Sequence, residues 1–151
     1  MRRCSALMLI GFMALPGCND ELVYRHYSTH AAAVAAGEVQ RGWLPEWIPS
    51  TASDLHLQND LDSNEWWLRF QLPVATRDSL KTQLEAADAA SVHVSRPWRA
   101  TWWFEGLIQK EPANDAALNA QLFRRCCDAL QRSQVLAFDR NTPTVYVWTE
   151  R

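Results

Sequence analysis

The clearest alternation of apolar and polar positions lies in residues 65–72. Large apolar side chains occupy every second position there: Trp66, Leu68, Phe70 and Leu72. Because side chains along a strand point alternately to the two faces of a sheet, this period of two predicts a strand with one buried face. Near the C-terminus, the apolar runs 135–138 and 144–148 flank a polar, Pro-containing segment, which predicts a hairpin. Segments 92–94 and 100–104 predict shorter strands.

Three segments have the composition or spacing of helices. Residues 30–40 are rich in Ala, the best helix former, and follow Ser28 and Thr29, either of which can cap a helix that ends at Gly42. A second helix is predicted from Thr76 onward. The third begins at Asn114 and has the most regular apolar stripe, formed by Leu118, Leu122, Cys126 and Leu130 with Phe123 beside it. The sequence therefore predicts a single small α+β domain, with a largely antiparallel sheet of four or five strands and about three helices.

Residues 43–49 cannot form regular structure, because Pro45 and Pro49 each fix φ and lack a backbone donor. We expect a rigid turn here. Its apolar side chains should lie against the core: Trp43, Leu44, Trp47 and Ile48.

The N-terminus has the pattern of an export signal. Arg2 and Arg3 precede an apolar segment, residues 6–15, which is about half the length of roughly 20 residues that a helix needs to cross a bilayer. Leu15-Pro16-Gly17-Cys18 follows and resembles the lipobox of bacterial lipoproteins, although Pro16 is unusual at its position. The resemblance implies cleavage before Cys18 and acylation of its side chain. The alternative is an ordinary signal peptide.

The lipobox resemblance divides the chain into a signal peptide (1–17), an acylated Cys18 with a short spacer (18–27) and a periplasmic domain (28–151). Membrane lipid is then a partner through Cys18. In the lipoproteins that this segment resembles, an Asp directly after the acylated cysteine favours the inner membrane. Here Asn19 occupies that position and Asp20 follows it, so the resemblance favours the outer membrane only slightly. Removing Arg2 and Arg3 from the 15 basic residues leaves 13 against 17 acidic ones, a net charge of −4. This acidic balance argues against nucleic acid as a partner.

A second resemblance rests on the run Gly42-Trp43-Leu44-Pro45 with Ile48-Pro49, followed by residues 53–56 and 60–65. Over residues 27–72 the chain resembles bacterial proteins with a YbbD-like head domain. That family implies no established activity, so the resemblance concerns fold and not chemistry.

Cys126 and Cys127 are adjacent, within the third predicted helix. Neighbouring helical positions point to different faces, so we interpret the two as small apolar residues, one or both of them buried. The alternatives are a disulfide between the two neighbours and an intermolecular bridge.

The polar residues suggest little catalytic chemistry. Asp60-x-Asp62-x-Asn64 imitates the start of a calcium loop but lacks its Gly and its final Glu, so we interpret it as a turn capped by its own side chains. His26 and His30 have metal-ligand spacing, but the predicted helix cap falls between them. We expect four histidines that are solvated or singly hydrogen-bonded, and assign no catalytic residue, metal site or cofactor.

Eight Trp residues are the remaining candidates for function. One member of each adjacent pair, Trp66/Trp67 and Trp102/Trp103, should face away from the core or be covered by a helix. A binding surface could then be formed by Trp67, Arg69, Arg96, Trp98 and Arg99. The alternative is that Trp side chains simply cover the second face of the sheet.

Three functional hypotheses follow. The first is a non-enzymatic envelope lipoprotein whose domain binds another protein or a cell-wall component. The second is a small envelope hydrolase that uses His56 or His93 with a nearby Asp. The third is a structural role without a ligand. An exposed Trp/Arg patch would favour the first, and a concave pocket with a hydrogen-bonded His–carboxylate pair would favour the second.

Overall fold

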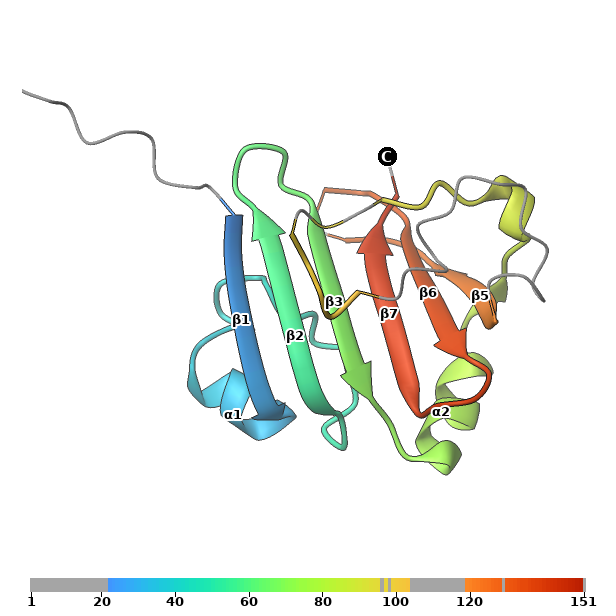
Figure 1. The fold of residues 1–151 in the computed structure, drawn as a ribbon, viewed down its shortest axis with the longest axis horizontal. Coiled ribbons are helices and arrows are strands. Elements are labelled where there is room, and N and C mark those ends of the chain that lie inside the picture. The colour runs from blue at the N-terminus through green and yellow to red at the C-terminus, as the bar shows by residue number, and fades with distance from the viewer. Residues whose placement is uncertain (1–21, 96, 98, 104–118, 129, 151) are drawn as a thin grey trace, which may run out of the picture.

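Seven antiparallel strands form one sheet in the order β1-β2-β3-β7-β6-β5-β4 (Figure 1). The structure is a computed structural model and describes residues 22–95, 97, 99–103, 119–128 and 130–150. The strands are β1 (Leu22–Thr29), β2 (Ser53–Asp60), β3 (Trp66–Gln71), β4 (Glu85–Ala86), β5 (Ala120–Arg125), β6 (Gln134–Asp139) and β7 (Thr144–Thr149). Two α-helices are described, α1 (His30–Ala35) and α2 (Val74–Lys81), with one 3₁₀ turn at Ala89–Ser91. The described part of the chain is thus a single small domain made mostly of sheet.

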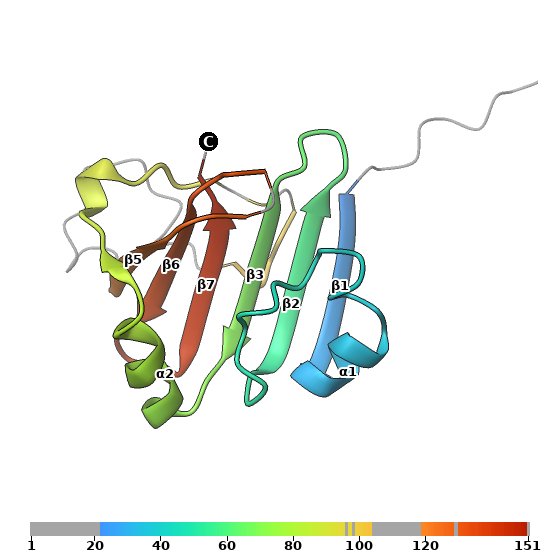
Figure 2. The ribbon, with the colours of Figure 1, turned by 180° about the vertical axis from the view of Figure 1, so that it is seen from behind.

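The sheet is buried on both faces. The helices and the segment between α1 and β2 lie over one face (Figure 2), where Leu68, Phe70 and Val147 belong to the larger core. The second face carries a smaller aromatic core with Trp67 and Trp148, crossed by the segment through residues 99–103 (Figure 1). We call these the helix face and the aromatic face. The alternation predicted for β3 is confirmed, but both of its faces are buried, not one.

Several sequence predictions are confirmed. The C-terminal hairpin is formed by β6 and β7. Thr29 caps α1, its Oγ1 accepting from the Ala32 N–H at 3.2 Å. Asp60 closes its own turn, since Oδ1 accepts from the N–H groups of Asp62 and Ser63. The expected turn over residues 43–49 buries Leu44 and Ile48 but leaves Trp43 and Trp47 partly exposed.

The predicted count of four or five strands and about three helices is wrong for the described residues. Residues 120–125, placed in the third helix, form β5. The pair Leu122↔Ala137 joins β5 to β6, so Leu122 enters the aromatic core while Phe123 packs on the helix face against Phe138. Asn114 and Leu118 lie outside the described residues. Residues 92–94 and 100–103 form no strand.

The first helix also differs from the prediction. It ends at Ala35, five residues early, because Gly37 takes a left-handed φ of 84° and turns the chain away. The second helix begins at Val74, slightly before the predicted Thr76. β1 begins at Leu22 and so includes residues 22–27, which were assigned to the spacer. None of the described helices is long and apolar enough to cross a membrane.

Candidate functional site

A groove of about 630 Å³ opens on the helix face, between the turn after α1 and the loop from β5 to β6. Trp66 of β3 and Trp47 of the Pro-rich turn line it, and Arg125, Asp128 and Gln134 line it on the other side. A second depression of about 300 Å³ adjoins it, since Gly42, Trp66 and Asp128 belong to both. We call the two together the Trp66 groove.

Tryptophans and arginines alternate along this groove. The Arg125 guanidinium lies 5.1 Å from the ring centroid of Trp47, and that of Arg41 lies 5.4 Å from the ring of Trp43. These are cation–π distances, which hold both aromatic faces in a fixed orientation. Arg132 lines the second depression. The groove therefore presents aromatic side chains beside guanidinium groups, two of which are paired with carboxylates: Arg41 with Glu38 and Arg132 with Asp128.

Two polar atoms of groove residues lack partners. The Trp47 Nε1 and the Gln134 Oε1 are buried and have no hydrogen-bond partner among the described residues. Leaving such a donor or acceptor unpaired costs about 1–3 kcal/mol, and most native structures avoid it. Both atoms are covered by protein, so a ligand in the groove reaches them only when neighbouring side chains move.

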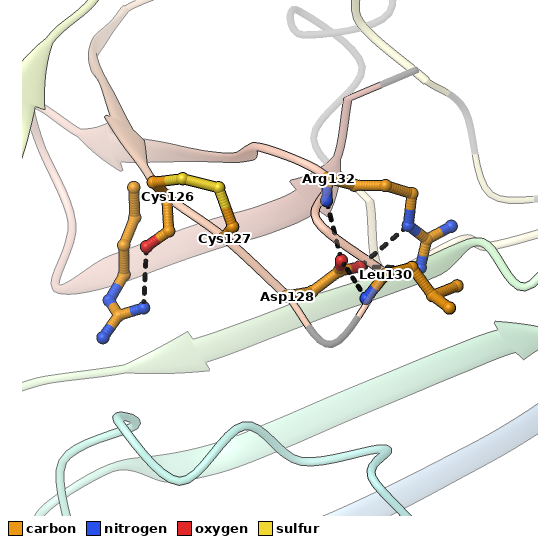
Figure 3. The surroundings of a disulfide bond; sticks show 6 residues. Cys126, Cys127, Asp128, Leu130 and Arg132 are labelled. Atoms are coloured by element: carbon orange, nitrogen blue, oxygen red, sulfur yellow. Dashed lines mark hydrogen bonds and ion pairs between the residues drawn. A yellow bond between two sulfur atoms is a disulfide. The ribbon is translucent and has the colours of Figure 1, made fainter.

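The loop between β5 and β6 is held by its own side chains (Figure 3). Asp128 Oδ1 accepts from the N–H groups of Leu130 and Arg132, both at 2.9 Å, and Oδ2 accepts from Arg132 Nε at 2.8 Å. Cys126 and Cys127 form a disulfide with each other, and Cys127 lines the groove. Of the alternatives that the sequence left open, the disulfide between the two neighbours is therefore the one present. The prediction that one or both cysteines are buried is wrong, because these residues follow a strand instead of lying in a helix, with Cys126 exposed and Cys127 half-buried.

The opposite wall is anchored by Glu38. Its carboxylate is fully buried and accepts hydrogen bonds from the Tyr27 hydroxyl and from Arg41 Nη2, the latter at 2.9 Å. Its carbonyl accepts from the N–H groups of Trp43 and Leu44 at 2.9 and 3.1 Å. Glu38 thus fixes the start of the turn that carries the groove tryptophans.

Of the five residues in the binding surface predicted from the sequence, the structure describes three, so the surface as a whole stays a prediction. Trp67 is 4% exposed and lies in the aromatic core, together with Trp103. Arg69 is paired with Asp54 at 3.0 Å, and Arg99 is exposed. Arg96 and Trp98 lie outside the described residues. The exposed Trp/Arg combination occurs instead on the helix face, at Trp43, Trp47, Arg41 and Arg125.

The histidines are not all isolated, contrary to expectation. His26 and His30 lie in different elements, as the cap position indicated, but His26 of β1 pairs with His56 of β2. Both Nε2 atoms contact the same Asp54 oxygen, Oδ1, at 3.0 and 3.1 Å. His93 is exposed and belongs to no such pair. This contact follows from the register of β1 against β2, which local sequence pattern does not predict.

Asp54 is the centre of this cluster on the aromatic face. It stands at a β-bulge with a left-handed φ of 49°. Arg69 Nη1 and Gln71 Nε2 donate to its second oxygen, Oδ2. Burial raises the pKa of its carboxyl, but the hydrogen bonds from both histidines and the Arg69 charge outweigh this and hold the pKa below its usual value.

The environment of His56 keeps its ring neutral. Burial lowers the pKa of the imidazole, and the hydrogen bond to Asp54 only partly offsets this effect. The Tyr24 hydroxyl lies 2.8 Å from His56 Nδ1. The ring can therefore accept from Tyr24 at Nδ1 and donate to Asp54 from Nε2.

Residues 21–71 match the family model of the YbbD head domain, which is about a third of the chain. The matched region holds β1, β2 and β3, and therefore the Pro-rich wall of the Trp66 groove and the whole His–Asp cluster. The wall supplied by Arg125, Cys127 and Asp128 lies outside it. Comparison with curated proteins and with solved structures gave no match. Over its first three strands, the chain is therefore similar to YbbD head domains.

Proposed function

We propose that this protein is a membrane-anchored envelope lipoprotein that binds another envelope protein or a cell-wall component in the Trp66 groove. In this proposal, signal cleavage follows Gly17, lipid on Cys18 supplies the anchor, and the domain faces the periplasm, at the outer membrane in preference to the inner. The similarity to YbbD head domains supports an envelope location. The groove itself carries the binding part of the proposal.

Its size and chemistry support binding of an extended ligand. About 630 Å³ falls within the usual range of ligand sites, roughly 300–1,000 Å³. Trp and Arg are the side chains most enriched where binding energy concentrates, because they combine a large apolar area with a polar group. A sugar ring or a peptide side chain could pack against the exposed part of Trp47.

Photo-crosslinking in intact cells tests this proposal. A photoreactive amino acid replaces Glu46, an exposed residue that lines the groove. The matched control carries it at Gln83, an exposed residue in the loop after α2. We expect a discrete adduct from position 46 only, and about tenfold less of it in a Trp47→Ala background, because buried aromatic contacts dominate interface energies.

The adduct also identifies the class of partner. A protein adduct keeps its full mass after digestion with a peptidoglycan hydrolase, whereas a cell-wall adduct is cut down to a small added mass on the protein. Equal labelling from positions 46 and 83, or no adduct from position 46, would contradict binding in the groove.

The alternative function is a small envelope hydrolase, favoured by the hydrogen-bonded pair of His56 and Asp54. A neutral imidazole oriented by a carboxylate is the arrangement of a general base. However, neither depression of the Trp66 groove includes these residues, so we rank binding first. The test is hydrolysis of a panel of esters, amides and phosphoesters by the wild type and by His56→Ala. Turnover that disappears in the variant would favour the hydrolase, and no turnover by the wild type would count against it.

A further inference from the structure

We propose that His26, Asp54 and His56 bind one divalent transition-metal ion of the zinc type on the aromatic face. Each residue offers one ligand atom, and the three atoms lie within 4.8 Å of one another. The set of two imidazoles and one carboxylate is among those that zinc adopts in proteins. The site lies on the opposite face of the sheet from the Trp66 groove, so it does not depend on the proposed function.

The interatomic distances already approach those of a coordination sphere. His26 Nε2 and His56 Nε2 lie 3.0 and 3.1 Å from Asp54 Oδ1. Ligands at roughly 2.0–2.1 Å from a tetrahedral zinc ion lie about 3.3 Å apart. Two of the three distances between ligand atoms are therefore already close to those of a coordination sphere, and the third, between the two imidazole nitrogens, is at most 4.8 Å.

The backbone fixes the positions of all three residues. His26 and His56 stand directly opposite each other on neighbouring strands, with ring centroids 4.4 Å apart. Asp54 precedes His56 by two residues and so lies on the same face, at the bulge that brings its carboxylate under both rings. A site built on paired strands loses little freedom when the ion binds.

A second layer of hydrogen bonds orients the ligands. Arg69 and Gln71 donate to Asp54 Oδ2 and leave Oδ1 to the histidines. The Tyr24 hydroxyl lies at His56 Nδ1, so with an ion on Nε2 the Nδ1–H can donate to the tyrosine oxygen. Metal-bound imidazoles almost always have such an outer partner on the other nitrogen. The Arg69 charge partly neutralises Asp54, so we expect a weaker site than one with an uncompensated carboxylate.

The cluster is open to solvent on the side of the edge strand. The side chain of His26 is 48% exposed, whereas that of His56 is 15% exposed, with the Trp102 ring stacked 5.6 Å from it. Three protein ligands with an open side leave a position for water, as in zinc sites that bind exogenous groups. An ion can enter without opening the fold.

Isothermal titration of the full chain with Zn²⁺ tests the proposal. The protein is purified in detergent without a polyhistidine tag and stripped with a chelator. A Cys126→Ser/Cys127→Ser background prevents these two cysteines from offering thiol ligands on reduction of their disulfide. We expect saturable binding of a single ion and, with Co²⁺ as a second probe, visible absorption bands of a low-symmetry site.

His26→Ala should weaken Zn²⁺ binding more than about tenfold, at least as much as loss of an outer-shell partner does. This residue lies on an exposed edge strand, so the variant should fold, and an unchanged circular dichroism spectrum checks that. His93→Ala, at an exposed histidine outside the cluster, is the matched control and should leave the affinity unchanged. Absence of saturable binding by the wild type, or equal affinities of the His26 variant and the wild type, would overturn the proposal.

Discussion

Glu38 is a carboxylate without exposure to solvent, placed beneath the turn that carries Trp43 and Trp47. Tyr27 and Arg41 both donate to Oε1, while Oε2 is buried without a hydrogen-bond partner among the described residues. A buried charge is tolerated only when paired, and the Arg41 guanidinium supplies the pairing. Glu38 therefore links the end of α1 to the shape of the Trp66 groove.

Replacing this charge tests that link. Glu38→Gln keeps the volume but removes the ion pair with Arg41, so we expect the free energy of unfolding to fall by about 1–3 kcal/mol. Urea denaturation measures it. Glu46→Gln, an exposed carboxylate of the same turn, is the control and should change stability by less than about 0.5 kcal/mol. Equal stabilities of the two variants would show that Glu38 is not a structural anchor.

Glu150 predicts how stability responds to acid. Arg124 donates to both of its oxygens, Nε to Oε2 at 3.0 Å and Nη2 to Oε1 at 3.1 Å, and the His93 N–H donates to Oε1. Burial raises the pKa of the Glu150 carboxyl, but these donors outweigh it and lower the pKa below 4.5. The unfolded state then binds more protons than the folded one near that pH.

A group whose pKa is lowered by folding contributes stability above its unfolded pKa, and the contribution is lost as the pH falls through the folded pKa. Wild-type stability should therefore drop from about pH 6 to about pH 3 more steeply than that of Glu150→Gln. Urea denaturation at several pH values in this range gives the slope of unfolding free energy against pH for both proteins. Parallel curves for the two proteins would mean that the Arg124–Glu150 pair makes no contribution.

The hydrophobic pattern of the sequence correctly predicted the strands whose pairing partners lie close to them in the chain. The β6–β7 hairpin needs only a short turn, and the alternation along β3 stands by itself. β5 was mistaken for a helix because Leu122 and Cys126 are four apart, a spacing that suits a helix face. In the structure Leu122 faces Ala137 across the ladder with β6. Pairing with a neighbouring strand outweighs the local helix propensity of these residues, and it cannot be predicted from this stretch of sequence alone.

The candidate sites show the same limit. The Pro-rich turn was predicted from its own residues, but its contact with Arg125 depends on where β5 lies in the sheet, far along the sequence. His26 and His56 are separated by 29 intervening residues and meet only through the β1–β2 register. Trp67 follows the reading in which Trp side chains cover the second face of the sheet, since it lies in the aromatic core with Trp103. Local pattern left its exposure open, because it does not show that residues 99–103 cross this face.

The end of α1 gives a prediction about a single element. Gly37 has φ 84°, and a Cβ there would stand 3.3 Å from Arg41 Nη1. Gly37→Ala should cost about 1–2 kcal/mol from backbone strain and, in addition, disturb the Arg41–Glu38 pair. Gly42→Ala is the matched control, since its φ is 75° but nothing lies within 4 Å of the added Cβ. The midpoint temperature of thermal unfolding should be highest for the wild type, lower for Gly42→Ala and lowest for Gly37→Ala. The reverse order of the two variants would contradict a role for Arg41 in this turn.

For the whole molecule, the sheet separates the two proposed sites. The Trp66 groove lies on the helix face and the His–Asp cluster on the aromatic face, with the central strands between them. Substitutions at sites that share no partner usually act independently. Trp47→Ala should leave Zn²⁺ affinity unchanged, and His26→Ala should leave crosslinking from position 46 unchanged. A change in either measurement would reveal coupling through the sheet.

The proposed membrane attachment also belongs to this scale. A single acyl chain anchors a protein only marginally, at about 0.8 kcal/mol per buried CH₂, so firm attachment without a basic patch requires more than one acyl chain on Cys18. The domain would then stand close to the bilayer, since Leu22 follows Cys18 by four residues, a span of at most about 14 Å.

Cys18→Ser should move the protein from the membrane pellet to the soluble or uncleaved fraction. The intact mass of the wild type should show loss of residues 1–17 with added lipid. Cys4→Ser, in the discarded segment, is the control and should leave attachment intact. A wild type that is soluble and carries no lipid would refute the anchor, while the groove and the His–Asp cluster could still be tested as before.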